Sequence, residues 1–237
     1  MLGRFLELSL PAPEILRSWE YYQALGFTSA TVGEIWPYRY AAVSDGRLSI
    51  GLHAASLEEP LLSFVRPELA RHLPALADAG VDFTREIVGD EEFNEALFTA
   101  PDAQPVRLLE ARTFSPPVHP AASRLGWFEE YMLAVGHLED AQAYWERIGF
   151  VTAAGGEEPW PHLSLTSDTL NIGLYRTRDL PRPTLLFGID DLNAFDARLE
   201  AVGVRPERRL PAGLDPATHR MLVAPEGTHL LVGPSRD

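Results

Sequence analysis

Two stretches of the sequence carry aromatic and histidine side chains in the same order. The first reads WPYRYAAVSDGRLSIGLH (36–53) and the second WPHLSLTSDTLNIGLY (160–175). Their candidate ligand-binding residues are Trp36, Tyr38, Tyr40, His53, Trp160, His162 and Tyr175. Aromatic faces hold planar or cationic molecules by stacking, so these rings could line a flat pocket. They could equally pack a helix onto a sheet, and both interpretations stay open here.

The residue types that are absent exclude several kinds of chemistry. The chain has no cysteine, and all 20 of its basic residues are arginine. A thiolate nucleophile, a zinc–thiolate site and an iron–sulfur cluster are therefore impossible. Without lysine, Schiff-base catalysis and the lysine-containing phosphate loop are impossible too. What remains is acid–base chemistry by histidine, carboxylate and tyrosine, or ligand binding alone.

Composition places the chain among globular proteins. It has 237 residues, 46% of them hydrophobic, and a net charge of −14. Such an acidic chain is a poor partner for nucleic acid, whose phosphates need clustered cations. The negative charge suits a cationic ligand, or serves solubility only. No apolar run reaches 18 residues and no signal peptide is visible at the N-terminus, so we expect a cytoplasmic protein with no membrane partner.

Matching segments recur along the chain at a nearly constant offset. Gly26-Phe27 matches Gly149-Phe150, and Ala100-Pro101 matches Ala224-Pro225, at shifts of 123 and 124 residues. A register held over this length indicates one unit built twice. We expect domains at 1–115 and 127–237, joined by a proline-rich linker at 116–126.

Each half is expected to run strand, helix and several strands, and to do so twice, which makes four βαβββ units. In residues 5–10, alternation puts Leu6, Leu8 and Leu10 on one face and Phe5, Glu7 and Ser9 on the other. Helices are expected at 13–26 and 190–203, the second with an aspartate cap. Pro74 should kink a further helix at 67–80.

The two strand–helix openings, ELSLPAPEILRSWEYYQALGF (7–27) and EYMLAVGHLEDAQAYWERIGF (130–150), carry a resemblance. They resemble the pattern of the vicinal oxygen chelate superfamily, which includes glyoxalase I, bleomycin-resistance proteins and extradiol dioxygenases. The resemblance covers nearly the whole chain as a tandem, two-domain member. It implies an α+β fold of tandem glyoxalase-like domains. Each domain would form a cupped mixed sheet from two βαβββ units, with helices outside.

The resemblance also implies the positions at which metalloenzymes of the superfamily hold a divalent ion. They fall here at Glu7, Gly51 (with His53), Leu61 and Arg107, and at Glu130, Gly173 (with Tyr175), Thr184 and Leu231. A hard divalent ion needs several oxygen or nitrogen ligands, and a neighbouring arginine repels it. We therefore expect no bound metal and no cofactor.

The two halves differ at these positions. Glu7 and Arg107 lie on strands that converge on the cavity in this fold, and the arginine could neutralise the carboxylate. That pair is either part of a ligand site or a structural ion pair. Glu130 faces a leucine instead and should have no such partner. With His229 it could form a catalytic acid–base pair, unless the carboxylate is solvated and the histidine lies at an edge.

Three functions fit these residues. The first is a metal-independent binding protein for a small aromatic or cationic ligand, as in the antibiotic-sequestering members of the superfamily. The alternative is an enzyme of the lyase or dioxygenase type, or one with metal-free acid–base chemistry through Glu130 and His229. The third is a scaffold without a ligand. We expect a monomer or weak homodimer that binds a small molecule.

Overall fold

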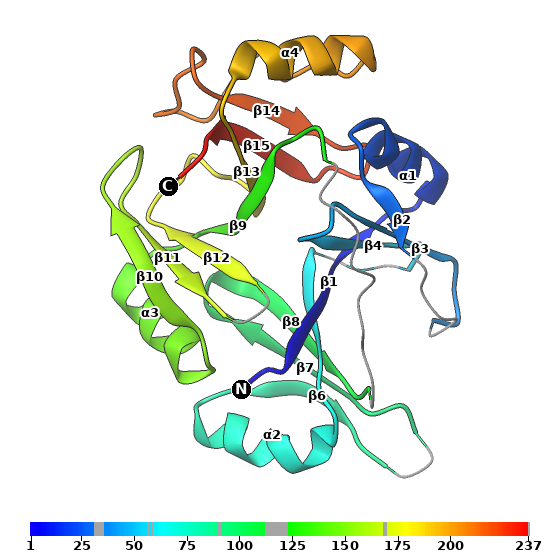
Figure 1. Cartoon of the computed structure of the whole chain (residues 1–237). Helices are drawn as coiled ribbons and strands as arrows, with labels where there is room; N and C mark the ends of the chain where they lie inside the picture. Colours follow the sequence, from blue (N-terminus) through cyan, green and yellow to red (C-terminus); the bar gives the residue numbers. More distant parts are fainter. Residues whose placement is uncertain are drawn as a thin grey trace.

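The computed structural model describes residues 1–30, 36–55, 57, 59–89, 92–111, 123–167 and 170–236. Their strands form two sheets in the middle of the molecule, and four helices lie at its periphery (Figure 1). No helix in these ranges is long and apolar enough to cross a membrane. The predicted linker at 116–126 falls mostly outside them, so the domain boundaries stay a prediction.

The N-terminal sheet has eight strands in the order β2-β3-β4-β1-β5-β8-β7-β6. They are β1 (Arg4–Pro11), β2 (Thr28–Ala30), β3 (Tyr40–Ser44), β4 (Ser49–His53), β5 (Leu61–Val65), β6 (Phe83–Ile87), β7 (Glu95–Ala100) and β8 (Gln104–Leu109). The helices α1 (Ile15–Ala24) and α2 (Leu69–Asp78) follow β1 and β5, and a short 3-10 turn, η1 (Pro101–Ala103), precedes β8. The pairs β1–β4 and β5–β8 are parallel, whereas β1–β5 is antiparallel. The predicted mixed α+β architecture is confirmed.

The C-terminal sheet has seven strands in the order β10-β11-β12-β9-β13-β15-β14. They are β9 (Trp127–Ala134), β10 (Val151–Gly156), β11 (His162–Thr166), β12 (Asn171–Tyr175), β13 (Thr184–Ile189), β14 (Arg220–Val223) and β15 (His229–Pro234), with α3 (Leu138–Arg147) after β9 and α4 (Leu192–Ala201) after β13. The prediction of four βαβββ units is wrong for the last one, because residues 202–219 form no strand. Pro206, Pro211 and Pro216 lack the N–H that a sheet ladder needs.

Local sequence explains how the helices begin and end. Gly26 and Gly149 follow α1 and α3 with φ of +89° and +110°, a conformation that glycine adopts without strain. The carboxylate of Asp191 accepts a bond from the backbone N–H of Ala194 at 2.9 Å, which confirms the predicted cap of α4. Helix α2 continues through Pro74 as one element.

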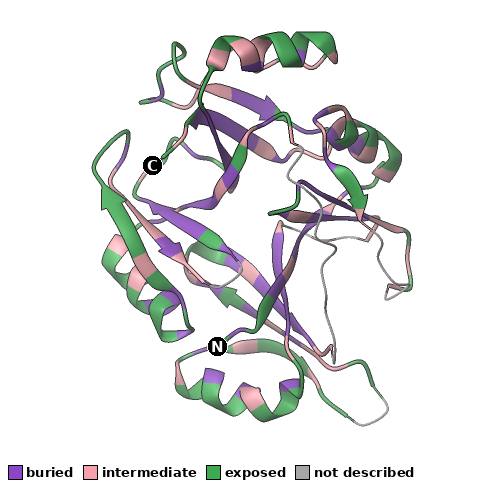
Figure 2. Ribbon diagram, viewed as in Figure 1, coloured by how far each residue is buried: buried purple, intermediate pink, exposed green. Residues whose placement is uncertain are grey.

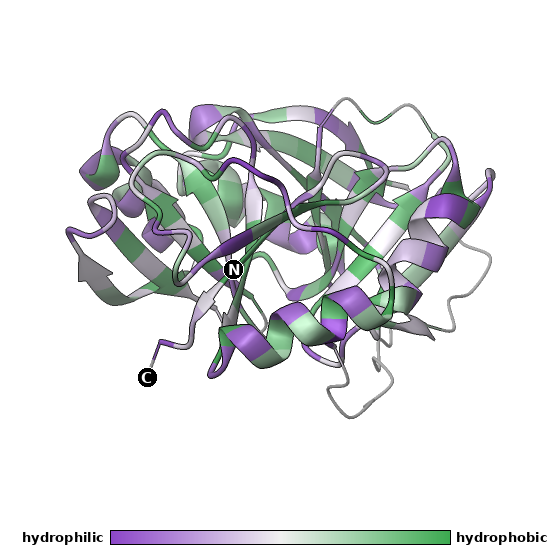
Figure 3. Ribbon diagram, turned by 90° about the horizontal axis from the view of Figure 1, so that it is seen from above, coloured by the Kyte–Doolittle hydropathy of each residue, from purple (hydrophilic) through white to green (hydrophobic). Residues whose placement is uncertain are grey.

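One hydrophobic core runs through both halves. It joins the helix-facing side of each sheet to buried residues of all four helices, among them Tyr22, Leu73, Trp145 and Phe195. Buried positions follow the strands and the inward stripe of each helix (Figure 2). Hydrophobic and hydrophilic residues alternate around the helices (Figure 3), as expected for amphipathic elements packed on a sheet.

A β-bulge in the first strand of each sheet changes which residues face the helices. The pairing of β1 with β5 shifts by one residue between Phe5 and Glu7. The pairing of β9 with β13 shifts in the same way, opposite Leu186 and Phe187 of β13. Phe5 therefore joins Leu8 in the core, whereas Glu7 points to the other side. Strict alternation had put Phe5 and Glu7 on one face, which is wrong because the bulge adds a residue. We call the side of each sheet away from its helices the inner face.

Side-chain hydrogen bonds also connect the two halves. The hydroxyl of Tyr131, on β9, donates to Oε1 of Gln104, on β8, at 2.9 Å. Tyr22 on α1 donates to Glu226, beside β15, at 2.7 Å. The rings of Phe27 and Phe187 meet edge to face, with centroids 6.4 Å apart. The halves therefore share buried polar contacts as well as apolar ones.

Replacing Tyr131 by phenylalanine should destabilise the protein by about 1–3 kcal/mol, because the buried Gln104 oxygen loses its donor. Tyr144→Phe is the matched control, since the buried Tyr144 hydroxyl has no partner in the described chain. That change should be neutral or slightly stabilising. Urea unfolding measures the free energy of unfolding of both variants, and an equal loss of stability in the two would contradict the prediction.

Candidate functional site

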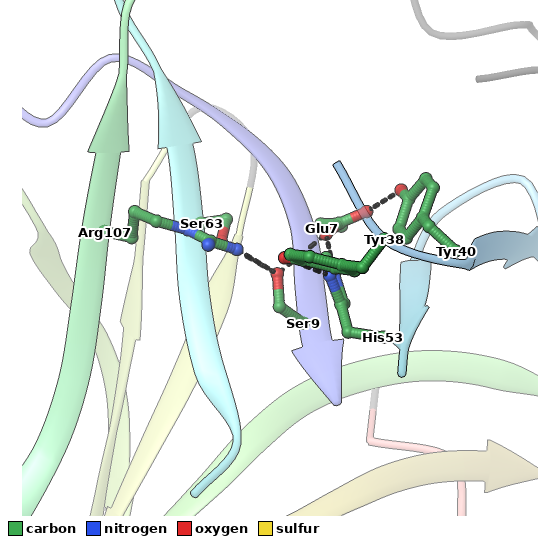
Figure 4. Close-up of polar contacts among 7 residues, drawn as sticks. All are labelled: Glu7, Ser9, Tyr38, Tyr40, His53, Ser63 and Arg107. Carbon is green, nitrogen blue, oxygen red and sulfur yellow. Dashed lines mark hydrogen bonds and ion pairs between the residues drawn. The ribbon is translucent and has the colours of Figure 1, made fainter. Parts of the chain in front are cut away.

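Glu7 lies at the centre of a polar cluster on the inner face of the N-terminal sheet. Glu7 is 2% exposed, and its carboxylate receives hydrogen bonds from three side chains. Oε1 meets Nε2 of His53 and the hydroxyl of Ser9, each at 2.7 Å, and Oε2 accepts from the hydroxyl of Tyr40. We call Glu7, Ser9, Tyr38, Tyr40, His53, Ser63 and Arg107 the Glu7 cluster (Figure 4).

His53 connects the carboxylate to an aromatic wall. With Nε2 donating to Glu7, its Nδ1 is left as the acceptor for the hydroxyl of Tyr38, 3.1 Å away. The tautomer follows from this network. Trp36 stacks on Tyr38 with ring centroids 5.8 Å apart, and it meets His53 edge-on at 5.3 Å. The three predicted rings of this half therefore surround the imidazole, and each stays partly exposed.

Arg107 belongs to the cluster but does not hold Glu7 directly. Its Nη2 donates to Ser9 at 3.0 Å and to Ser63 at 3.2 Å, and its Nε donates to Ser63 at 3.3 Å. The expected Glu7–Arg107 ion pair is wrong, because Ser9 stands between the two charges and bonds to both. Sequence reasoning did not single out Ser9 and Ser63, although alternation does put Ser9 on the face of Glu7.

The glycine of each Ile-Gly-Leu triplet makes room for a buried carboxylate. A Cβ on Gly51 would overlap the Glu7 carboxylate, and one on Gly173 would overlap that of Glu130. Only a residue without a side chain lets the carboxylate lie against the neighbouring strand. This accounts for the repeated triplet.

The hydrogen bonds keep Glu7 ionised. Burial alone would raise its pKa, but the hydrogen bonds from His53, Tyr40 and Ser9 outweigh burial and lower it. The pKa of Tyr40 is raised, first by burial and then by the Glu7 charge that its hydroxyl faces. The pKa of Tyr38 is raised by burial as well, and the charge of Arg107 opposes that rise. Both tyrosines are therefore neutral donors at neutral pH.

Glu130 occupies the matching position of the C-terminal sheet, with different partners. Ser164 donates to its Oε2 at 2.7 Å, and Tyr175 donates to Oε1. Arg236, beyond the last strand, donates to Oε1 from Nη1 at 2.7 Å and to the Tyr175 hydroxyl from Nη2 at 2.7 Å. The expectation that Glu130 has no cationic partner is wrong. Nothing in the spacing of the sequence pointed to Arg236, which follows β15 and folds back.

The structure does not bring His229 to Glu130. Both lie on the inner face, but His229 is next to Arg182 and Glu207, and its Nδ1 is buried without a partner in the described chain. Burial, followed by the charge of Arg182, lowers the pKa of His229. The expected acid–base pair is therefore not formed.

Much of the inner face of the C-terminal sheet is apolar. A second hydrophobic cluster fills it, made of Met132, Trp160, Tyr175, Leu180, Leu186, Leu214, Met221 and Leu231. The indole of Trp160 donates to the carbonyl of Ala212 at 3.1 Å, which ties the strandless segment 202–219 onto this face. His162 stacks on Tyr175 with centroids 5.1 Å apart. Of the aromatic residues predicted in this half, Trp160 is thus used for packing.

A pocket of about 630 Å³ opens beside Glu130. Glu129, Ser164 and Arg236 line it from the C-terminal half, and Arg47 reaches it from the β3–β4 turn. Burial raises the pKa of Glu129, bonds and charge from Arg236 oppose the rise, and the charge of Glu130 adds to it. This carboxyl can exchange a proton closer to neutral pH than an exposed one. Sequence reasoning missed it, because the bulge turns it into the pocket.

Comparison with known proteins finds similarity in structure alone. No protein-family model and no curated protein matches the sequence. A catechol 2,3-dioxygenase superposes with a TM-score of 0.61 at 13% identity, covering 99% of this chain and 90% of that one. A homoprotocatechuate 2,3-dioxygenase from Brevibacterium fuscum (E323L mutant) gives 0.66 at 13% identity, covering 100% and 72%. The fold is that of the extradiol dioxygenases. These enzymes belong to the vicinal oxygen chelate superfamily.

The residues present do not fit a divalent ion at the positions that this fold implies. In the N-terminal half both nitrogens of His53 are engaged, Leu61 offers no donor and a guanidinium lies on the same face. In the C-terminal half Glu130 is ion-paired to Arg236, and Leu231 packs in the apolar cluster. No three acidic or histidine side chains gather within the described ranges. That the purified protein holds no metal stays a prediction.

The Glu7 cluster should make stability depend on acid pH in a defined direction. The pKa of Glu7 is lower in the folded than in the unfolded protein. Its contribution to the free energy of unfolding is therefore complete above the unfolded carboxyl pKa of about 4.3, and it is lost as pH falls through the folded pKa. Lowering the pH from 7 to 3 should therefore reduce the melting temperature of the wild type more than that of Glu7→Gln. The exposed control Glu20→Gln should follow the wild type, and a Glu7→Gln curve parallel to both would contradict the assignment.

Gly51→Ala should destabilise the protein by about 1–3 kcal/mol, because the new methyl group overlaps the Glu7 carboxylate in a buried network. Gly136→Ala serves as the control, since its Cβ would meet nothing closer than Asp102 Oδ1 at 3.9 Å. Chemical unfolding measures both. Equal stability of the two variants would show that Glu7 can move away freely.

Proposed function

We propose that the chain is an enzyme that transfers protons to and from a small carbonyl compound at the Glu7 cluster. The observation that carries this proposal is the line of bonds from Tyr38 through His53 to Glu7. The carboxylate orients the imidazole, and the imidazole in turn accepts from a partly exposed hydroxyl. This is the arrangement of an activated acid–base group.

The contrast between the two inner faces supports the choice of site. The N-terminal face buries Glu7, Ser9, His53, Ser63 and Arg107, whereas much of the C-terminal face is filled with apolar side chains. Buried charged groups are costly and weak evidence for stability, so a cluster of them is better explained by function. The structural neighbours are enzymes. This favours the enzyme interpretation over a metal-independent binding protein, although fold alone does not define function.

The proposed step is proton abstraction from a carbon next to a carbonyl group. The C–H bond breaks as the Tyr38 oxygen takes the proton, and the proton that Tyr38 held passes to Nδ1 of His53. The electron pair left on carbon moves into the carbonyl, which gives an enolate. The imidazolium formed on His53 lies against the ionised Glu7, whose charge stabilises it. Return of the proton completes an exchange.

Solvent exchange tests this step without requiring the natural substrate. A panel of enolisable carbonyl compounds in D₂O should lose the proton signal of the acidic carbon faster with the protein than in buffer alone. Tyr38→Phe should slow this exchange at least about 100-fold, since it removes the group that takes the proton. Tyr144→Phe, outside the cluster, should exchange like the wild type.

Two outcomes would overturn the proposal. One is exchange no faster than in buffer across the whole panel. The other is full activity in both Tyr38→Phe and His53→Gln, with both variants shown to be folded by circular dichroism.

A further inference from the structure

Arg107 carries a buried positive charge whose acceptors are neutral. The side chain is 4% exposed, and its bonds to Ser9 and Ser63 go to hydroxyl groups. Within the described ranges no carboxylate comes within 4.0 Å of its guanidinium nitrogens. A buried guanidinium is normally paired, because leaving water costs several kcal/mol per ion. The charge of Glu7 does not fill this role, because three other donors already take up its oxygens.

Trp36 supplies a second donor at the same place. Its ring lies over the Arg107 guanidinium at 4.4 Å, and its Nε1–H is buried with no acceptor in the described chain. An unpaired buried donor costs about 1–3 kcal/mol, so an acceptor is expected there. A cation and an unpaired N–H donor at the same place favour the binding of an anion.

A carboxylate would be a stronger acceptor for Arg107 than the neutral hydroxyl groups that it reaches. Its Nε and Nη2 bond to Ser9 and Ser63, and the Tyr38 hydroxyl also lies within hydrogen-bonding reach of the guanidinium. Carboxylates match the fork of a guanidinium and form strong, charge-assisted bonds with it. Trp36 and Tyr38 form a stacked pair that can hold a flat group attached to the carboxylate.

We propose that the Glu7 cluster recognises a small carboxylate, held by Arg107 and the Trp36 indole N–H, with the rest of the molecule against Tyr38. This inference rests on the proposed proton transfer. A carboxylate bound in this way would put the carbon next to it, or next to its 2-oxo group, within reach of the Tyr38 hydroxyl. It replaces the expectation of a cationic ligand, which rested on the overall charge of −14.

Calorimetric titration with benzoate and benzamide tests the charge requirement, since the two differ little in shape. Benzoate should bind the wild type at least about tenfold more tightly than benzamide. Arg107→Gln should abolish that preference. Trp36→Phe keeps a ring over Arg107 but loses the N–H, so it should weaken benzoate binding several-fold. This second variant keeps the test informative if Arg107→Gln does not fold.

Arg47→Gln is the matched control, because Arg47 also lies over an indole, that of Trp127, at 3.9 Å, but in the pocket beside Glu130. It should leave benzoate binding unchanged. Equal affinity for benzoate and benzamide, tighter binding of benzylammonium, or a loss in Arg47→Gln alone would overturn the proposal. So would the absence of binding by formate, acetate, pyruvate and benzoate alike.

The outcomes separate this inference from the proposed function. If carboxylates bind as described but no compound exchanges protons, recognition stands and proton transfer fails. If neutral ketones exchange as fast as 2-oxo acids, and Tyr38→Phe stops both, proton transfer stands and carboxylate recognition fails.

Discussion

Each sheet buries a carboxylate against its own central strands, and this requirement shapes the residues around it. The bulge in β1 turns Glu7 to the inner face while Phe5 stays in the core. Gly51 then has to lack a side chain, because the carboxylate lies where its Cβ would be. The donors follow, because an ionised group that is 2% exposed is tolerable only when hydrogen bonds replace the lost water. The same constraints hold in the C-terminal sheet, where β9 has a bulge and a Cβ on Gly173 would overlap the Glu130 carboxylate.

The two halves satisfy this shared requirement with different chemistry. Glu130 receives a guanidinium from Arg236, a fixed charge that cannot exchange a proton at neutral pH. Glu7 instead accepts from the imidazole of His53, whose other nitrogen accepts from Tyr38. The arginine of the N-terminal half is separated from the carboxylate by Ser9 and bonds to neutral hydroxyl groups. Two carboxylates in equivalent positions thus have a guanidinium as partner in one sheet and an imidazole bonded to a tyrosine in the other.

Periodicity and caps predicted the fold class well because they depend on local backbone preferences. Gly26, Gly149 and Asp191 end or begin helices as expected, and the two sheets have the mixed order implied by the resemblance. The site was harder to predict. Alternation on β1 failed at one inserted residue, and strand position said nothing about which donor each carboxylate would choose. Arg236 lies more than 100 residues from Glu130 and outside any repeated motif, so only the folded chain brings them together.

The continuous core explains how the two sheets can differ without separating. Residues of all four helices and the helix-facing side of both sheets form a single cluster, and buried bonds such as Tyr131 to Gln104 cross between the halves. Gln104 begins β8, the strand that also carries Arg107. Packing against the C-terminal half therefore helps to set the position of the strand that presents the guanidinium. The apolar filling of the second inner face contributes to that rigid support, since a sheet packed on both sides has little freedom to shift. One half can thus act as the frame against which the charged groups of the other are held in place.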